Sequence, residues 1–453
     1  MKKSTLFVLY AATLSQPILA QQSWTLRQCA DYAIEHNISI KQQDNQRKQR
    51  DIQLSTAKNS RLPDLSASAS ESFSFGRGLT LDNTYTNRST NSTSFSLGTT
   101  VPLFTGFQIP NQIKLNQLNL EAATQDLEKA KNDIRMQVAQ AYVQILYNME
   151  IADVAHRQIT IDSAQVVRLQ AFVDNGKASQ AELSQQQSAL AQAQLTATQA
   201  DNNLQLSVLA LTQLLELPSP DGFSIVRPST TTPATSLAGP SSSTTPAGFP
   251  AGLSPDAIYQ EALAIKPEVK AELLRLSASE RNIDIAKAGN YPTLSLNAGL
   301  QSNYYKTNGM QAESFASQMK NNFSQYIGLN LSVPIFNRFQ TRNNIRSARI
   351  DRENQILQVE NVKKSLYKEI QQVYYNAVAA DSKYHSSEVA AQSSKDAFTL
   401  MQAKYENGKA TITEFNEAKN NYLKAESDLV QSRYENLYQI TLLNFYRGRE
   451  LDF

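Results

Sequence analysis

The chain has 453 residues, 41% of them hydrophobic, and a mean hydropathy of −0.42. This length allows one large or two medium domains. The formal net charge is +2, and Lys2 and Lys3 lie in a predicted signal peptide, so the mature chain is neutral. A neutral chain lacks the basic surplus that would indicate a nucleic-acid partner. Cys29 is the one cysteine of the sequence, which excludes an internal disulfide.

Residues 1–20 have the pattern of a secretory signal peptide: two lysines, an apolar core too short to span a membrane, and Ile18-Leu19-Ala20 at the end. Cys29 follows Leu26-Arg27-Gln28, which lacks the small residues expected before a lipidated cysteine, so we expect no lipid anchor. No later run of about 18 apolar residues occurs, so the exported chain would be soluble or would enter a membrane as a β-barrel.

The first predicted helix begins at Thr25, where Gln28 three residues later completes a capping box. It runs to about Ser60, roughly 35 residues, and Leu62-Pro63 ends it because the residue before a proline avoids the α region.

Two alternating segments follow, at residues 65–75 and 93–101, with small polar residues on one face and apolar residues on the other. This two-residue period predicts a hairpin of strands with one wet and one apolar side, joined by a polar loop over residues 76–90. A hairpin of a soluble sandwich is the alternative interpretation. Aromatic residues cluster at the strand ends, as in the girdles of membrane barrels: Phe73, Phe75, Phe104 and Phe107.

A very long helix is predicted from Pro110, since no glycine or proline follows before Gly176. Its length of roughly 65 residues corresponds to roughly 95 Å, far beyond an ordinary globular helix. Its apolar residues keep coiled-coil spacing, among them Ile134, Val138, Ala141, Ile145, Ile159, Val166 and Leu169.

A shorter antiparallel helix follows Asn175-Gly176 and runs to about Glu216, with apolar residues at heptad spacing from Leu183. Its roughly 39 residues cover little more than half of the long helix. We therefore expect the first helix to be stacked end to end with it along the rest of its partner.

Residues 227–254 are rich in Ser, Thr, Pro and Gly and predict a disordered linker. A second copy of the same order begins with Ser254 as a cap and Pro255 at the first helical position. It comprises a helix, alternating segments at 294–300 and 327–333 around a loop at 303–323, a long helix at 341–406 and a shorter one at 411–446. The chain is thus a tandem repeat of residues 21–226 and 255–453.

Two short motifs recur in both copies. Val101-Pro102-Leu103-Phe104 and Val333-Pro334-Ile335-Phe336 follow the alternating segments, and Asp174–Ala178 and Glu406–Ala410 both contain Asn-Gly-Lys-Ala. In this arrangement, together with Ala391-Gln392-Ser393-Ser394 leading to Tyr405, the chain resembles the TolC-type outer-membrane efflux proteins. The resemblance covers nearly all of the mature chain except the linker.

The expected fold is mostly α, with a long α-helical coiled-coil barrel and four transmembrane β-strands per chain. Four strands cannot close a barrel, whose minimum is about eight, and an open sheet edge cannot face lipid. Eight strands enclose only packed side chains, so a conduit favours three chains over two. The resemblance likewise implies a homotrimer with one 12-strand barrel, placed in the outer-membrane lipid of a Gram-negative bacterium, with the helices forming a tunnel in the periplasm.

The resemblance also implies a gate at the glycine turns. Glu414 and Glu417 match acidic residues that form rings narrowing the pore, and Glu182 is expected to pair with Tyr405. The arginine that the family has two residues after the second turn glycine is replaced by Ala410, so we expect a more weakly held gate. The alternative is that these carboxylates are ordinary solvated helix residues.

The two turns are expected to dock the hairpin tips of a periplasmic adaptor protein, and through it an inner-membrane pump. The alternative is that they serve as helix caps alone. The expected docking residues are Asn175, Gly176, Lys177, Asn407, Gly408 and Lys409.

No catalytic or metal-binding pattern is found. His36, His156 and His385 lack metal-ligand spacing, and no nucleophile motif, phosphate loop or catalytic carboxylate pair occurs, so we expect neither an enzyme nor a cofactor. The predicted function is a passive exit duct for efflux or type I secretion. A trimeric coiled-coil spacer or adhesin without channel activity is the alternative; it should have one barrel segment at a terminus, whereas this chain has two internal hairpins.

Overall fold

The computed structural model describes residues 23–79, 83–227 and 254–451. The predicted signal peptide and residues 228–253 of the predicted linker lie outside these ranges. The chain divides into two units, one built from residues 1–40, 131–262 and 367–453 and the other from residues 41–130 and 263–366. We call them the coiled-coil unit and the sheet unit.

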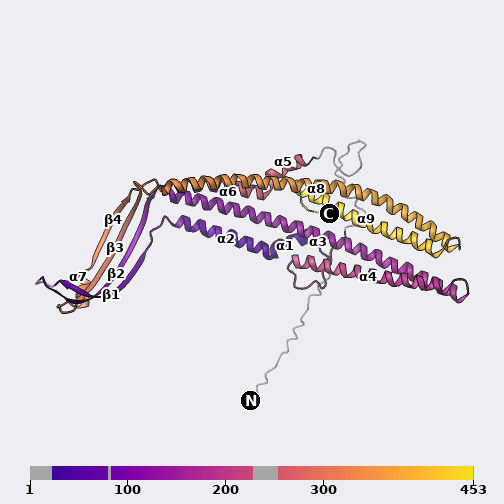
Figure 1. The fold of residues 1–453 in the computed structure, drawn as a ribbon, viewed down its shortest axis with the longest axis horizontal. Coiled ribbons are helices and arrows are strands. Elements are labelled where there is room, and N and C mark those ends of the chain that lie inside the picture. The colour runs from indigo at the N-terminus through magenta and orange to yellow at the C-terminus, as the bar shows by residue number, and fades with distance from the viewer. Residues whose placement is uncertain (1–22, 80–82, 228–253, 452–453) are drawn as a thin grey trace, which may run out of the picture. The chain divides into compact units, whose positions relative to one another are not determined.

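The helices occur in two matched sets (Figure 1). Each set has helices of 11, 22, 67 and 35 residues in the same order, which confirms the predicted tandem repeat. The first set is α1 (Leu26–His36), α2 (Ile38–Asn59), α3 (Gln108–Asp174) and α4 (Gln180–Leu214). The second set is α5 (Pro255–Ile265), α6 (Pro267–Ala288), α8 (Gln340–Glu406) and α9 (Ile412–Tyr446).

The first helix begins with the predicted capping box of Thr25 and Gln28, but the expectation of one continuous helix is wrong. Asn37 breaks it with an extended backbone, φ −60° and ψ 131°. The break is stabilised because the Asn37 side chain donates to Leu214 O at 3.1 Å and accepts from Ser39 N at 2.9 Å. The end of α4 therefore lies at the α1–α2 junction.

Helix α1 buries one face in the coiled-coil unit. Leu26, Cys29 and Ala33 recur at helical spacing on this face, and Cys29 is 0% exposed. Burial raises the pKa of the Cys29 thiol to about 12, since a thiolate would be desolvated there.

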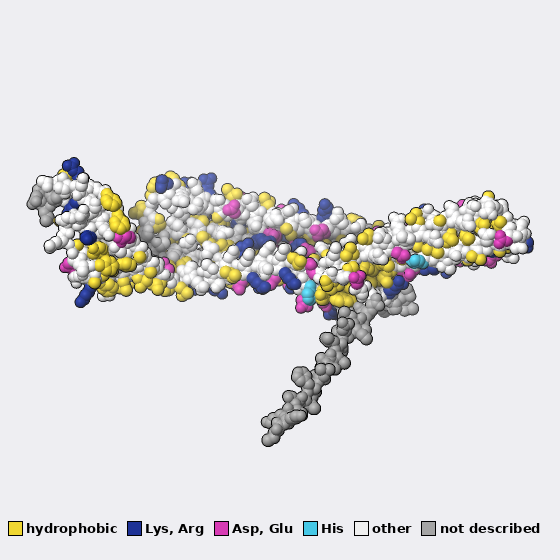
Figure 2. Space-filling view, turned by 90° about the horizontal axis from the view of Figure 1, so that it is seen from below, with side chains coloured by type: hydrophobic (Ala, Val, Ile, Leu, Met, Phe, Trp, Pro, Cys, Tyr) yellow, Lys and Arg dark blue, Asp and Glu magenta, His cyan; other side chains and the backbone are white. Residues whose placement is uncertain are grey.

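One four-stranded antiparallel sheet occupies the sheet unit, in the order β1 (Ser66–Leu79), β2 (Tyr85–Thr105), β3 (Thr293–Thr307) and β4 (Ser324–Ser332). The two predicted hairpins thus pair with each other through β2 and β3. The register places apolar residues together on one face, for example Leu97 opposite Leu300 and Ala298 opposite Ile327. Figure 2 shows hydrophobic side chains gathered over the sheet.

The other face of the sheet is polar and almost without charge. Ser68 pairs with Ser96, and Ser70 with Ser94, through hydroxyl contacts of 2.7 Å. The neighbouring positions on β3 and β4 follow by register: Asn297, Gly299, Gln301 and Asn303, then Ser324, Tyr326, Gly328 and Asn330.

The strands are longer than predicted. The polar loop expected at residues 76–90 is wrong, because β1 continues to Leu79 and β2 begins at Tyr85. Residues 76–79 pair with residues 85–88 across the hairpin, and these ladder hydrogen bonds outweigh the weak strand propensity of the segment. In the second copy, the expected loop contains a short helix, α7 (Phe315–Asn321).

The two Val-Pro-x-Phe motifs differ in structure. The first lies within β2, where the register shifts between Pro102 and Phe104, whereas the second follows the end of β4. Gly106, two residues after the first motif, has φ +62°, and a Cβ there would lie 2.8 Å from Ala288 O. Both the turn and the close approach therefore require glycine at this position.

Candidate gate at the helix tips

The two glycine turns of the coiled-coil unit have the same backbone geometry. Gly176 has φ +69° and Gly408 has φ +68°. Lys177 N donates to Phe172 O at 2.7 Å, and Lys409 N donates to Lys404 O at 2.8 Å. These bonds cap the ends of α3 and α8, as expected of a left-handed residue after a helix.

The asparagines of both turns also serve as caps. Asn175 Nδ2 donates to Ala171 O and Asn407 Nδ2 donates to Ala403 O, each at 2.7 Å. The residues predicted to dock an adaptor, Asn175, Gly176, Lys177, Asn407, Gly408 and Lys409, are all exposed. Their side chains and backbone edges are thus open to a partner at the end of each helical hairpin.

The first predicted gate carboxylate, Glu414, takes part in a capping box. Its Oε2 accepts from Thr411 N at 2.7 Å and from Thr411 Oγ1 at 2.9 Å. These hydrogen bonds, the backbone one first, lower the pKa of Glu414. Ser179 and Glu182 form the same box at the start of α4. Glu417 is exposed one turn further on and has no such role.

Tyr405 lies between the two hairpins. Its ring stacks on Phe415 at 5.0 Å, and the Arg168 guanidinium lies 5.3 Å from its centroid. Burial raises the pKa of Tyr405, while Arg168 lowers it and Glu182 raises it. Glu182 is thus close enough to act electrostatically on Tyr405, although within the described residues no hydrogen bond joins the pair.

Arg168 is a cation at this tip that sequence reasoning missed. Its Nη2 donates to Glu406 O, the last residue of α8, at 3.1 Å, and its guanidinium also lies 5.3 Å from the Phe172 centroid. A cation at a helix C-terminus is favoured by the helix dipole. Arg168 on α3 therefore contributes a cation near the turn after which Ala410 stands where the resemblance implies an arginine.

The hairpins are held together beneath the turns by an apolar cluster. Leu169 and Leu183 come from α3 and α4, and Phe398, Ile412 and Phe415 from α8 and α9. Figure 1 shows α4 running alongside α3 and α9 alongside α8. The cluster therefore joins four helices.

A buried polar network lies further along the same helices. Lys419 on α9 forms an ion pair with Asp162 on α3, with side-chain exposures of 2% and 0%. Gln186 on α4 donates to Asp162 Oδ1 at 2.9 Å, and Asn416 donates to Gln186 Oε1 at 3.2 Å. A buried ion pair is costly to break, because the remaining charge is left without a partner.

Sequence reasoning missed this network, although a signal was present. Asp162 lies between Ile159 and Val166, Gln186 follows Leu183 by three residues, and Lys419 follows Phe415 by four. These are core positions of the coiled coil, where a polar residue specifies which helices pair and in what register.

Further contacts join α3 to α9. Tyr434 donates to Glu150 Oε1 at 2.6 Å, and Arg157 pairs with Glu426 at 2.7 Å. Burial, together with this hydrogen bond to Glu150, raises the pKa of Tyr434. The two repeats are therefore cross-linked by polar contacts at several levels of the coiled coil.

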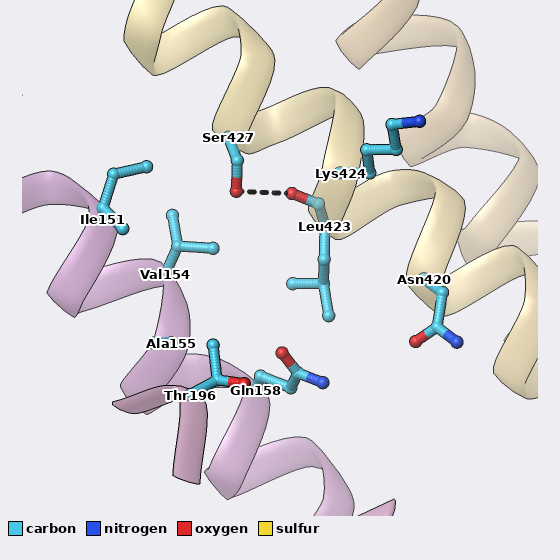
Figure 3. A pocket seen from close by; sticks show the side chains of 9 residues that line it. All are labelled: Ile151, Val154, Ala155, Gln158, Thr196, Asn420, Leu423, Lys424 and Ser427. Atoms are coloured by element: carbon cyan, nitrogen blue, oxygen red, sulfur yellow. Dashed lines mark hydrogen bonds between the residues drawn. The ribbon is translucent and has the colours of Figure 1, made fainter. Parts of the chain in front are cut away.

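A groove of about 240 Å³ lies between α3, α4 and α9 (Figure 3). Ile151, Val154 and Leu423 supply its apolar wall, and Gln158 and Lys424 are among its polar residues. Ser427 Oγ, on the same wall as Leu423, donates to Leu423 O at 2.9 Å. The groove therefore lies between the α3–α4 hairpin and α9, close to the buried network of Asp162, Gln186 and Lys419 that joins them.

The three histidines do not converge. His36 stacks on Tyr32 at 3.9 Å, and His156 contacts Asp201 at 3.0 Å. Among the described residues, no group of three His, Cys, Asp or Glu side chains could hold a metal ion. Over the same residues, none of the helices is both long and apolar enough to cross a bilayer.

The outer membrane efflux protein family matches residues 30–216 and 258–447, one match within each of the two predicted repeats. The chain belongs to this family. The efflux protein thus has the fold class predicted: mostly helical, with a small antiparallel sheet and an internal repeat.

Relatives of the efflux protein fit this assignment. It is 30% identical over 39% of its length to the fusaric acid resistance protein FusA of Burkholderia cepacia, and 24% identical over 42% to the outer membrane protein TolC of Vibrio cholerae. The matches span 30% and 42% of those two proteins. The crystal structure of CusC is similar in fold, with a TM-score of 0.76 at 17% identity, covering 94% of this chain and 92% of CusC.

Proposed function

We propose that this efflux protein is a passive trimeric exit duct in the outer membrane of a Gram-negative bacterium, working in a tripartite efflux or type I secretion system. The observation that carries the proposal is the incomplete sheet: β1 and β4 are edge strands, and one face is apolar. Three copies supply 12 strands, enough to close a barrel wide enough for a conduit.

The helices next to the sheet support the same assembly. Leu357 on α8 is 62% exposed and Ile350 is exposed near it, while Ile52 is exposed on α2. Helices α2 and α8 adjoin the edge strands β1 and β4 in the sequence. Copies that pair through the sheet edges would also cover these apolar side chains, since exposed apolar residues of this size favour burial in an interface.

The polar sheet face would line the conduit. Its residues are mostly Ser, Thr, Asn, Gln and Gly, with Arg88 near one end. Neutral hydroxyl and amide groups can form hydrogen bonds with a passing solute, and they favour neither cations nor anions. The barrel wall would therefore select little by charge, and selection would lie with the helix tips and the pump.

The tips would act as the gate. Glu417 is the predicted ring carboxylate that has no capping role, so it is the better candidate to face the narrow point, and Glu414 would reinforce it. Closure would depend on the contacts of Arg168 with Tyr405 and Glu406. A periplasmic adaptor at the exposed turns would compete for these contacts and open the tip.

The test is single-channel recording of the full-length protein in planar bilayers. Wild type should show small, cation-selective openings, Glu417→Ala should lose cation block, and Arg168→Ala should open more widely. A stable trimer that never conducts, in wild type or Arg168→Ala, would instead favour the spacer or adhesin.

Docking is tested separately with a photo-crosslinking residue at Lys177 or Lys409. We expect adducts with a co-expressed adaptor from both turns and none from Lys363, which lies on the same long helix as the second turn but far from it in sequence. Absence of adducts from both turns would remove the docking assignment and leave the channel assignment intact.

A further inference from the structure

An arginine stripe lies at the start of α8. We use this name for Arg342, Arg346 and Arg349, whose spacing of four and three residues aligns them on one face of the helix. All three are exposed. Arg352 nearby pairs with Glu280 at 3.2 Å, but no stripe arginine forms an ion pair with any residue in the described part of the chain. Three adjacent guanidinium groups without an ion-pair partner favour an anionic ligand.

The stripe begins where an exposed apolar surface ends. Leu331 on β4 is exposed, as are Val333, Phe336 and Phe339 after it, and Ile335 is 95% exposed. The Arg342 guanidinium lies 6.0 Å from the centroid of Phe339. Apolar strand residues followed by aromatic and then basic residues are the order found at a membrane–water boundary.

The stripe points away from α6. Helix α8 contacts this neighbour through Thr341, whose hydroxyl lies 3.4 Å from Gly289 O, and through Gln355, 2.6 Å from Glu272. At about 100° per residue these contact positions share one direction, and the stripe lies about a third of a turn from it. The opposite flank has no arginine: it is formed by Asn344, Ser347, Asp351 and Gln358.

Backbone chirality identifies which flank continues the apolar sheet face. Ser89 O accepts from Asn308 N, so odd-numbered residues of β2 direct their backbone groups toward β3. These residues belong to the apolar face, which sets the left-to-right order of the strands seen from that side. We take the helices to follow the same left-to-right order as the strands that they adjoin. Because α8 is right-handed, the arginine stripe then lies on the side of the apolar sheet face, and Asn344 lies on the side of the polar face.

We propose that the arginine stripe binds the phosphate groups of anionic phospholipids in the leaflet nearest the helices. The proposal rests on the proposed outer-membrane location. A guanidinium group matches two phosphate oxygens at once, and several arginines near a membrane surface act together on its negative charge. The exposed apolar residues of β4 and of the segment after it would place the stripe at the level of the lipid headgroups. The bound lipids would then fix the depth of the barrel in the membrane.

The test is native mass spectrometry of the full-length assembly titrated with phosphatidylglycerol or phosphatidylcholine. Wild type should bind phosphatidylglycerol about tenfold or more tightly than phosphatidylcholine. The triple variant Arg342→Gln, Arg346→Gln, Arg349→Gln should lose this preference. The matched control, Lys363→Gln, Lys364→Gln, Lys368→Gln, removes the same charge from the same helix and should keep it.

A triple variant that keeps the wild-type preference, or a wild type without one, overturns the proposal. So does an equal loss in the control, which would mean that net charge alone attracts the lipid. In planar bilayers the triple variant should keep the wild-type reversal potential; a shift toward cations would place the stripe in the conduit and also overturn it. Normal conductance without lipid preference would leave the channel function standing, whereas a silent wild type would overturn that function first.

Discussion

At the scale of single residues, the coiled-coil unit depends on polar groups placed where apolar ones are expected. The charges of Asp162 and Lys419 neutralise each other in the buried core, and Gln186 donates a hydrogen bond to the same carboxylate. Replacing one member of such a pair is far more costly than replacing both, because only the single change leaves an unpaired buried charge.

Lys419→Met should therefore lower the free energy of unfolding by about 3–5 kcal/mol. The double change Asp162→Leu with Lys419→Met should recover most of that loss. Thermal or denaturant unfolding followed by helical circular dichroism measures both, with Lys424→Met as the control on the same helix. If Lys419→Met melts like wild type, the pair contributes nothing to stability.

The cap at Glu414 predicts a pH dependence. Its pKa is lowered in the folded chain, so its contribution to stability is present above the normal carboxylate range and is lost as pH falls through the lowered value. Glu414→Gln keeps an acceptor for the cap but removes the charge. We expect wild type to protect the first turn of α9 better at neutral pH and the two proteins to converge in acid.

Amide hydrogen exchange of residues 412–416, compared between the two proteins at the same pH, measures this difference. Glu417→Gln is the control and should match wild type at every pH, since the Glu417 carboxylate makes no cap. A constant difference between wild type and Glu414→Gln over the whole pH range would contradict the charge-based explanation.

At the scale of elements, two turns with left-handed glycines differ in what surrounds them. A Cβ at Gly176 would meet no atom within 4 Å, whereas one at Gly106 would lie 2.8 Å from Ala288 O. Gly176→Ala should cost about 1 kcal/mol from backbone strain alone. Gly106→Ala should cost clearly more, because strain and a backbone clash add.

Thermal unfolding of the two glycine variants under one condition gives the comparison. Gly176→Asn serves as the control, since asparagine tolerates a left-handed backbone and should cost less than alanine. Equal losses for Gly106→Ala and Gly176→Ala would mean that the chain near Ala288 yields to the added methyl group.

The elements that sequence predicts best are those with one dominant local signal. The long helices follow from the absence of Gly and Pro over their length and from heptad spacing, and Gly176 and Gly408 mark their ends. The break at Asn37 was missed because it depends on Leu214, 177 residues away. The strand segment near Thr86 was missed because its order comes from pairing with β1 rather than from its own side chains.

The same distinction holds for the candidate gate. Local motifs indicated the turns and the carboxylates, but the capping role of Glu414 and the position of Arg168 depend on how helices meet. Arg168 lies on α3, whereas the sequence pattern directed attention to Ala410 after the second turn. A sequence pattern within one segment contains no information on the contacts that this segment makes with distant ones.

At the scale of the whole molecule, assembly should depend on the exposed apolar residues of α8. Leu357→Glu places a charge where a second copy would bury leucine, so we expect the trimer population to fall about tenfold or more. Size-exclusion chromatography with light scattering in detergent measures the distribution. Gln358→Glu adds the same charge at the next position and should leave the trimer intact; loss of the trimer in both variants would point to charge alone.

The sequestered Cys29 has a practical consequence for all of these measurements. A thiol that is 0% exposed and whose pKa is raised to about 12 has almost no thiolate at neutral pH, and thiolate is the form that maleimides alkylate. The native chain is therefore already a silent background for site-directed labelling. A single cysteine introduced at Lys177 or Lys409 would be the reactive one, so spin labels or fluorophores could report movement of each tip in an otherwise unaltered protein.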